Sequence, residues 1–199
     1  MGHPLIGDEF RVCNDFYIGR KGEVFIITGA NMAGKSTFLR TVGVNMVLGM
    51  AGAPVCAKKM QFKITTIFTS MNITDSLSEN ESYFYAEVKR LKQLIDAAMG
   101  GGDILVLLDE ILTGTNTKDK ETASKAFLER LLEMNITSLI ATHDLSLTSL
   151  AEKHPNTIYN KSFEVDMVGQ EMHYDYKIRE GAAKNMNALE LLRQMKLIK

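Results

Sequence analysis

The sequence predicts an α/β fold: a mostly parallel sheet covered by helices on both faces. Three largely apolar runs typical of buried strands support this prediction, at 23–28, 104–108 and 138–142. Amphipathic helical patterns alternate with them, over 36–49, 82–99 and 118–134. Parallel strands need crossover connections, usually helical, and a helix after each strand is the pattern that provides them.

Length and composition indicate one ordinary globular domain. A chain of 199 residues can bury a substantial core, and 45% hydrophobic with 24% charged residues is unremarkable. The formal net charge is −1, so no overall basic field indicates nucleic-acid binding. Any contact with DNA is therefore expected to come from a local patch or from segments absent from this chain.

The cysteines and the hydropathy pattern favour the cytoplasm. Cys13 and Cys56 are too few for a disulfide framework and lack metal-site spacing, so reduced thiols are expected. No apolar run approaches the ~18–20 residues that span a bilayer, and no signal peptide is evident. Because Met1-Gly2 is followed at once by His3-Pro4, residues 1–199 are expected to be a single-domain piece of a longer protein.

The first residues show weak alternation of apolar and polar side chains. Segment 4–18 therefore predicts one or two strands that turn at Asn14-Asp15, and Gly19-Arg20-Lys21-Gly22 predicts a turn before the next strand.

The glycine-rich segment 29–37 matches G-x-x-x-x-G-K-[ST], the phosphate-binding P-loop. Its members are Gly29, Ala30, Asn31, Met32, Ala33, Gly34, Lys35, Ser36 and Thr37. Successive backbone N–H groups and the positive end of the following helix would hold phosphate, Lys35 would reach the β- and γ-phosphates, and Ser36 would hold Mg²⁺. The alternative is a glycine-rich turn that binds nothing, but the flanking strand and helix favour ATP with Mg²⁺. Phe10 could stack on the adenine or pack in the core, and both interpretations stay open.

The middle of the chain predicts a strand over 64–70, a polar stretch over 72–82 and a helix over 82–99. Val88, Leu91 and Leu94 are expected on the apolar face of this helix, and Glu87 mostly on its wet side.

The apolar run 104–108 ends in two carboxylates, Asp109 and Glu110. At the end of a buried strand, such a pair fits the Walker B element of P-loop enzymes. Asp109 would bind Mg²⁺, and Glu110 would polarise the attacking water. Two solvated acids at the end of a strand are the alternative, which the nearby P-loop makes less favoured.

The next buried strand, 138–142, ends at His143. A lone histidine is usually structural or merely exposed, but ligand sites of α/β folds gather at this end of the strands. His143 is therefore expected to sense the γ-phosphate. Beyond it the sequence predicts a short helix over 145–153, an antiparallel hairpin of 157–167 with 172–179, a turn at 181–183 and a helix over 187–195.

Together these motifs resemble the ATPase domain of MutS-type proteins, of the ABC-ATPase class, over His3 to about Leu197. The Asn31-Met32 pair within the P-loop is unusual elsewhere. The other segments similar to family motifs are Ile67–Ser70, Asp75–Glu87, Leu107–Thr117, Ala141–His143 and Gly181–Ala183.

The resemblance implies Mg²⁺-dependent ATP hydrolysis at paired sites between two copies of the chain. Glu110, His143 and Lys35 would act on the nucleotide of one subunit, and Ser82 would reach the γ-phosphate held by the other. A homodimer with composite sites is therefore expected, slow as an ATPase in isolation. The family's mismatch-reading, clamp and helix-turn-helix segments are absent from this chain, so DNA contact would need those segments.

Departures from the family pattern indicate a divergent branch. Leu112-Thr113 replaces a Gly-Arg pair, which removes a positive charge, and Glu79 and Glu81 crowd the segment before Ser82. Three other functions stay open beside the ATPase: a dimerisation switch that binds ATP with little turnover, the nucleotide-binding subunit of a transporter, and a P-loop kinase.

Overall fold

A computed structural model describes residues 1–71, 83–114, 116–168 and 171–184. The polar stretch 72–82 with Ser82, and the helix expected over 187–195, lie outside the described residues.

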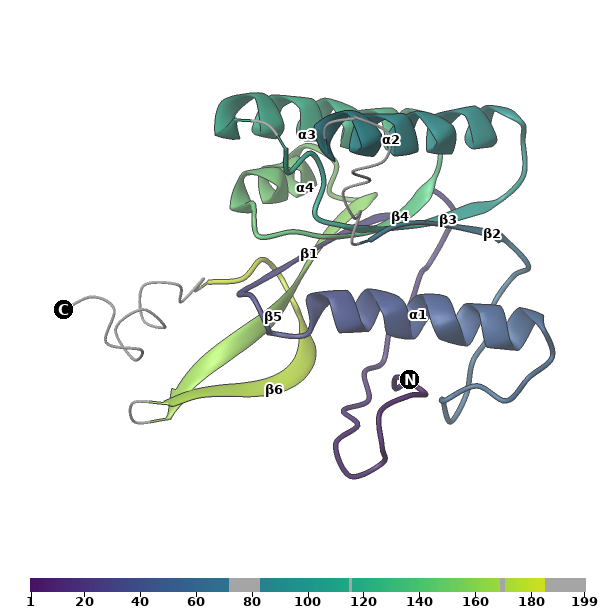
Figure 1. Ribbon diagram of the computed structural model, residues 1–199, viewed down its shortest axis with the longest axis vertical. Coiled ribbons are helices and arrows are strands. Elements are labelled where there is room, and N and C mark those ends of the chain that lie inside the picture. The colour runs from purple at the N-terminus through teal and green to yellow at the C-terminus, as the bar shows by residue number, and fades with distance from the viewer. Residues whose placement is uncertain (72–82, 115, 169–170, 185–199) are drawn as a thin grey trace.

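Six described strands form one mixed sheet in the order β2-β3-β4-β1-β5-β6 (Figure 1). Neighbouring strands from β2 through β5 pair in parallel, and β6 pairs antiparallel with β5. The predicted parallel sheet and C-terminal hairpin are thus confirmed. The strands are β1 (Val24–Gly29), β2 (Thr66–Ser70), β3 (Ile104–Asp109), β4 (Thr137–Ala141), β5 (Ile158–Val168) and β6 (Glu171–Glu180).

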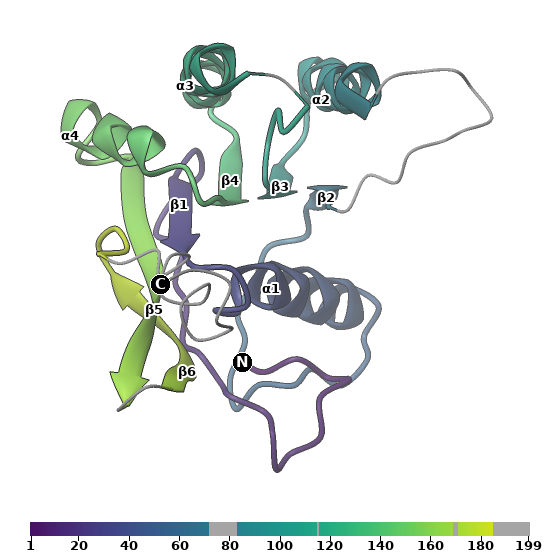
Figure 2. The same cartoon turned by 60° about the vertical axis from the view of Figure 1, so that its left-hand side comes forward.

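Helices cover both faces of the sheet, as the sequence predicts. Helix α1 (Lys35–Met50) lies on one face, and α2 (Tyr83–Met99), α3 (Thr117–Glu133) and α4 (Leu150–Lys153) lie on the other (Figures 1 and 2). A 3₁₀ turn, Leu145–Ser149, leads into α4. None of the described helices is long and apolar enough to cross a lipid bilayer.

The central strands are buried on both faces, which explains their uninterrupted apolar sequences. Val24 and Ile26 of β1 pack with the α2–α3 side, while Phe25 and Ile27 pack with α1. The same alternation divides β3, whose Val106 is fully buried in the first cluster. The sheet therefore separates two hydrophobic cores.

The strands expected within 4–18 are absent, because the described residues 1–23 form turns and extended coil. Side-chain contacts hold this segment instead of a backbone ladder. The Phe16 ring lies 4.8 Å from the Phe25 ring, between centroids, and packs on α1. The Asn14 amide donates to the Tyr176 carbonyl and accepts from the Ile178 N–H of β6. The N-terminal segment is thus attached to strand β6 of the hairpin. Cys13 and Cys56 are both free thiols.

The orientation of α2 differs from the expectation in one respect. Glu87, expected on the wet side, is 2% exposed, whereas Val88 is 39% exposed. Leu91 and Leu94 are buried as predicted. Glu87 lies four residues before Leu91 and seven before Leu94, which places it in the same helical stripe.

Candidate functional site

The segment 29–37 connects the end of β1 to α1 through two glycines that no other residue could replace without strain. Gly29 has φ +147°, and a Cβ there would lie 2.4 Å from the Phe163 carbonyl oxygen of β5. Gly34 has φ +108° and occupies the N-cap position of α1. Both conformations favour glycine, and both bring the backbone close to its neighbours.

The N-terminus of α1 is open to an anion. No side chain caps it, and its first turn contains no acidic residue. The first N–H groups of a helix have no partner within the helix, and the helix dipole adds positive potential there. A negatively charged group would be stabilised at this position.

Lys35 is the first residue of α1 and is only 6% exposed. Its Nζ donates to the carbonyl oxygens of Gly29 at 2.7 Å and Ala30 at 3.0 Å. Burial lowers the pKa of this ammonium, while the Glu110 and Asp109 carboxylates act in the opposite direction. Lys35 is thus a buried cation that two backbone carbonyls satisfy.

Glu110 follows β3 in a left-handed conformation, with φ +57°. Its N–H donates to the Ala141 carbonyl at 2.9 Å, which continues the pairing of β3 with β4. Its carboxylate accepts from the His143 N–H at 3.1 Å and lies 2.9 Å from His143 Nδ1. A non-glycine residue at positive φ is strained, and such strain collects at functional sites. The end of β4 therefore fixes where Glu110 points.

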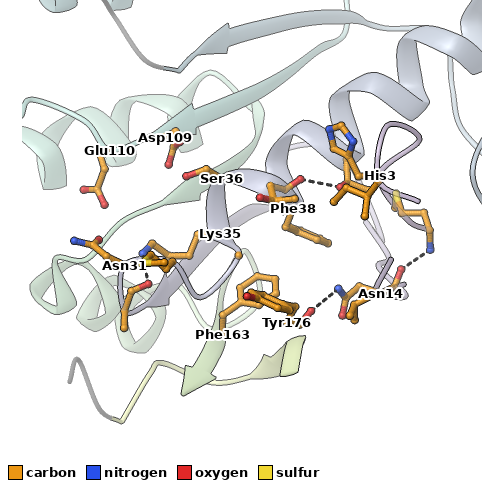
Figure 3. A pocket seen from close by; sticks show the side chains of 18 of the residues that line it. His3, Asn14, Asn31, Lys35, Ser36, Phe38, Asp109, Glu110, Phe163 and Tyr176 are labelled. Carbon is orange, nitrogen blue, oxygen red and sulfur yellow. Dashed lines mark hydrogen bonds between the residues drawn. The ribbon is translucent and has the colours of Figure 1, made fainter. Parts of the chain in front are cut away.

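These groups surround a cavity of about 630 Å³ (Figure 3). That volume lies within the ~300–1,000 Å³ typical of small-molecule sites. Of the predicted site residues, the lining includes Phe10, Ala30, Asn31, Met32, Gly34, Lys35, Ser36, Thr37, Asp109 and Glu110. The lining does not include Gly29, Ala33 or His143, but His143 contacts the lining residue Glu110.

Ser36 and Asp109 offer oxygen atoms to the same cavity (Figure 3). No group of three or more His, Cys, Asp or Glu side chains suited to a metal occurs in the described ranges. Mg²⁺ does not require such a cage, because it commonly uses one or two protein oxygens together with substrate phosphates and water. One hydroxyl and one carboxylate fit that ligand preference.

The N-terminal segment and β6 supply cavity residues that the sequence did not indicate. His3, Asn14 and Tyr176 line the cavity beside Phe10. Phe10 is 75% exposed, so the core-packing interpretation of this residue is wrong, and its stacking on adenine stays a prediction. Asn14 lies 162 residues from its partner Tyr176 along the chain, and no local pattern marks that pairing.

Hydrogen bonds to Glu87 connect α2 to the segment after Glu110. Its carboxylate accepts the N–H groups of Leu112 and Thr113, the latter at 3.0 Å. Burial raises the pKa of Glu87, and the two backbone donors and Lys120 partly oppose that shift. Gly114 permits the close approach, because a Cβ there would lie 2.8 Å from Phe84 Cβ. The helical spacing of Glu87 with Leu91 and Leu94 was the signal that could have indicated its burial.

The fold and the site define a class: an α/β domain whose glycine-rich segment, between the central strand β1 and helix α1, faces acidic residues at the end of β3. The family model described as MutS domain V matches residues 25–197. The chain therefore belongs to the MutS domain V family.

Curated relatives agree with this assignment. The chain is 33% identical over 193 residues to the DNA mismatch repair protein MutS of Thermotoga maritima, covering 95% of this chain and 24% of the relative. It is 32% identical to human MutS protein homolog 4 over 195 residues, covering 93% of this chain and 20% of the relative. It is 30% identical to the endonuclease MutS2 of Thermus thermophilus over 196 residues, covering 98% of this chain and 25% of the relative. The chain thus spans a quarter or less of the length of these relatives.

The burial of Glu87 predicts a pH-dependent stability. The pKa of this carboxyl is raised above its ordinary 4.5, so the folded state holds the proton more tightly than the unfolded chain does. The parent should therefore lose stability as pH rises from about 4.5 through the raised folded pKa. Glu87→Gln cannot ionise, so its free energy of unfolding relative to the parent should increase over the same window.

Urea unfolding of both proteins across the acid-to-neutral range measures this difference. Glu121→Gln is the matched control, because Glu121 is 42% exposed and pairs with Lys125 at the surface. The free energies of unfolding of Glu87→Gln and the parent could instead differ by the same amount at every pH. That result would contradict the burial of an ionisable Glu87.

Proposed function

We propose that this domain binds Mg²⁺·ATP in the 630 Å³ cavity and hydrolyses the γ-phosphate. It would do so as the ATPase domain of a MutS-family, DNA-associated protein of the P-loop ABC-ATPase class. One observation carries the proposal: the glycine-rich segment, the open N-terminus of α1 and the acids at the end of β3 border the same cavity.

The phosphates would lie on the backbone N–H groups at the start of α1. The uncapped helix end and its dipole suit a polyanion, and the absence of acids in the first turn removes repulsion. Lys35 Nζ would exchange the carbonyls of Gly29 and Ala30 for the β- and γ-phosphates. A preformed, buried ammonium loses little side-chain entropy in that exchange.

Ser36 and Asp109 would hold the Mg²⁺, Asp109 through water. When bound, Mg²⁺ neutralises charge that develops on the phosphate oxygens. Glu110 would orient and polarise the attacking water as general base, since its carboxylate already lies at the edge of the cavity. His143, 2.9 Å from that carboxylate, would report on the γ-phosphate through the same contact.

The adenine would lie toward the N-terminal segment. Phe10 and Tyr176 are 75% and 43% exposed and both line this part of the cavity. Exposed aromatic rings at a ligand cavity favour stacking on a flat base. Phe10 remains our first candidate, with Tyr176 as the second.

A homodimer with composite sites is the proposed working form. Ser82 would contact the γ-phosphate held by the other copy. The first turns of α2, directly after Ser82, present Phe84, Tyr85 and Val88 at 37%, 57% and 39% exposure. Apolar side chains gathered on one exposed helix end support a contact with a second copy.

The DNA-related role is proposed from family membership. Two of the relatives quoted above are named as a DNA mismatch repair protein and an endonuclease, and this chain covers a quarter or less of each. Contact with DNA would therefore come from segments outside this chain. Leu112-Thr113 in place of the family's Gly-Arg supports a divergent branch, and a cytoplasmic location stays a prediction.

A dimerisation switch with little turnover is the second candidate. The contacts of Glu110 with both the N–H and the ring of His143 favour it, because an engaged carboxylate is a poorer base. Membership of the MutS domain V family favours either of these functions over a transporter subunit or a kinase.

The paired variants Lys35→Ala and Glu110→Gln test the proposed function. Lys35→Ala removes the buried ammonium and should abolish ATP binding in calorimetry. Glu110→Gln should keep the affinity for ATP but lose hydrolysis by roughly 10²–10⁴-fold, because the amide cannot act as a base. Unchanged affinity in the first variant would exclude this cavity as the site. A parent-like rate in the second would exclude Glu110 as the base.

Dependence of the rate on protein concentration tests the composite site. A monomer would lack the partner's Ser82, so specific activity should rise with concentration. Ser82→Ala mixed with Lys35→Ala should regain one working site per heterodimer, although each variant alone is inactive. If specific activity is constant on dilution and mixing restores nothing, the site is complete within one chain. Binding of ATP without hydrolysis at any concentration would favour the switch.

A further inference from the structure

Lys120 occupies an unfavourable position for a cation. It is the fourth residue of α3, within the first turn, where the helix dipole repels positive charge. Its side chain is nevertheless only 13% exposed. Lysine is seldom buried to this extent unless a carboxylate accompanies it. The position therefore requires a compensating interaction.

A carboxylate from another element provides that interaction. Lys120 Nζ lies 3.9 Å from Oε2 of Glu110, which follows β3. That oxygen is buried, and His143 Nδ1 also lies 2.9 Å from it. The Lys120 charge also favours the ionised form of Glu87 on α2, whereas Glu110 disfavours it. The Lys120 charge thus acts on both acids.

Two other groups act on the Glu110 carboxylate. His143 is 54% exposed and approaches the same oxygen from the end of β4. Lys35 acts on Glu110 from the glycine-rich segment. Thr113 carries no charge, although the family resemblance leads one to expect arginine at this position. Lys120 therefore acts on Glu110 from α3, with much less of its side chain exposed than His143.

We propose that Lys120 is a positioning residue, whose ammonium holds the Glu110 carboxylate at the cavity. This inference rests on the proposed function, in which Glu110 is the general base. Glu87 also binds the backbone of Leu112 and Thr113. A movement of α2 on contact with a second copy would therefore reach the segment directly after Glu110.

Lys120→Met tests the proposal, because it removes the charge and keeps an unbranched side chain. We expect kcat to fall roughly 10- to 100-fold, as for a misplaced catalytic group, with the affinity for ATP unchanged. Lys120→Arg should retain most of the rate. If Lys120 had only a structural role, Lys120→Met would instead show a lower rate, weaker binding of ATP and a smaller folded fraction. Lys125→Met is the matched control on the same helix, since Lys125 pairs with Glu121 away from the cavity.

A second measurement needs no hydrolysis. Melting temperatures of the parent, Lys120→Met, Glu110→Gln and the double variant form a cycle in the absence of nucleotide. The fall in melting temperature of the double variant should be smaller than the sum of the falls in the two single variants. The two should differ by ~2–4 °C for each kcal/mol of coupling. Additive losses would overturn the inference, and so would a Lys120→Met rate equal to or above that of the parent. A parent that does not hydrolyse ATP would overturn the proposed function, while the cycle still tests the contact.

Discussion

The parallel pairing of β1, β3 and β4 is the constraint on which the site depends. Ala141 of β4 is the register partner of both Ile27 and Asp109. Because parallel strands end at the same edge of a sheet, this register brings the glycine-rich segment, Glu110 and His143 together from three distant parts of the sequence. Helix α1 begins at that edge and adds its positive end. The site thus follows from strand register together with one short connection.

Several charged side chains are largely buried around this edge of the sheet. Each lies near a charge of opposite sign or near several backbone partners, and they are Lys35, Glu87, Lys120 and Glu110. A buried ion pair is weak evidence for stability, because desolvation offsets much of the attraction. Their concentration at one end of the sheet is better explained by function. They connect α2, α3 and the segment after β3, so the position of one element depends on the others.

The sequence could predict those parts of the fold and site that depend on local patterns. The strand endings at Asp109 and at His143, the glycine-rich segment and the hairpin follow from runs and periodicity within a few residues. The expected strands within 4–18 were wrong because aromatic packing of Phe16 replaced a backbone ladder. Tyr176 could not be predicted, since tertiary pairing with the N-terminal segment brings it to the cavity. Glu87 could have been predicted from its helical stripe, but its charge suggested the surface.

A crystal structure with Mg²⁺ and a non-hydrolysable ATP analogue tests directly whether this cavity is an ATP site. We expect the phosphates on the N–H groups at the start of α1 and the metal on Ser36 and Asp109. We also expect Lys35 Nζ to leave the carbonyls of Gly29 and Ala30, which it contacts at 2.7 and 3.0 Å, for the β- and γ-phosphates. An analogue bound elsewhere, or a Lys35 that keeps both carbonyls beside a bound nucleotide, would contradict the account.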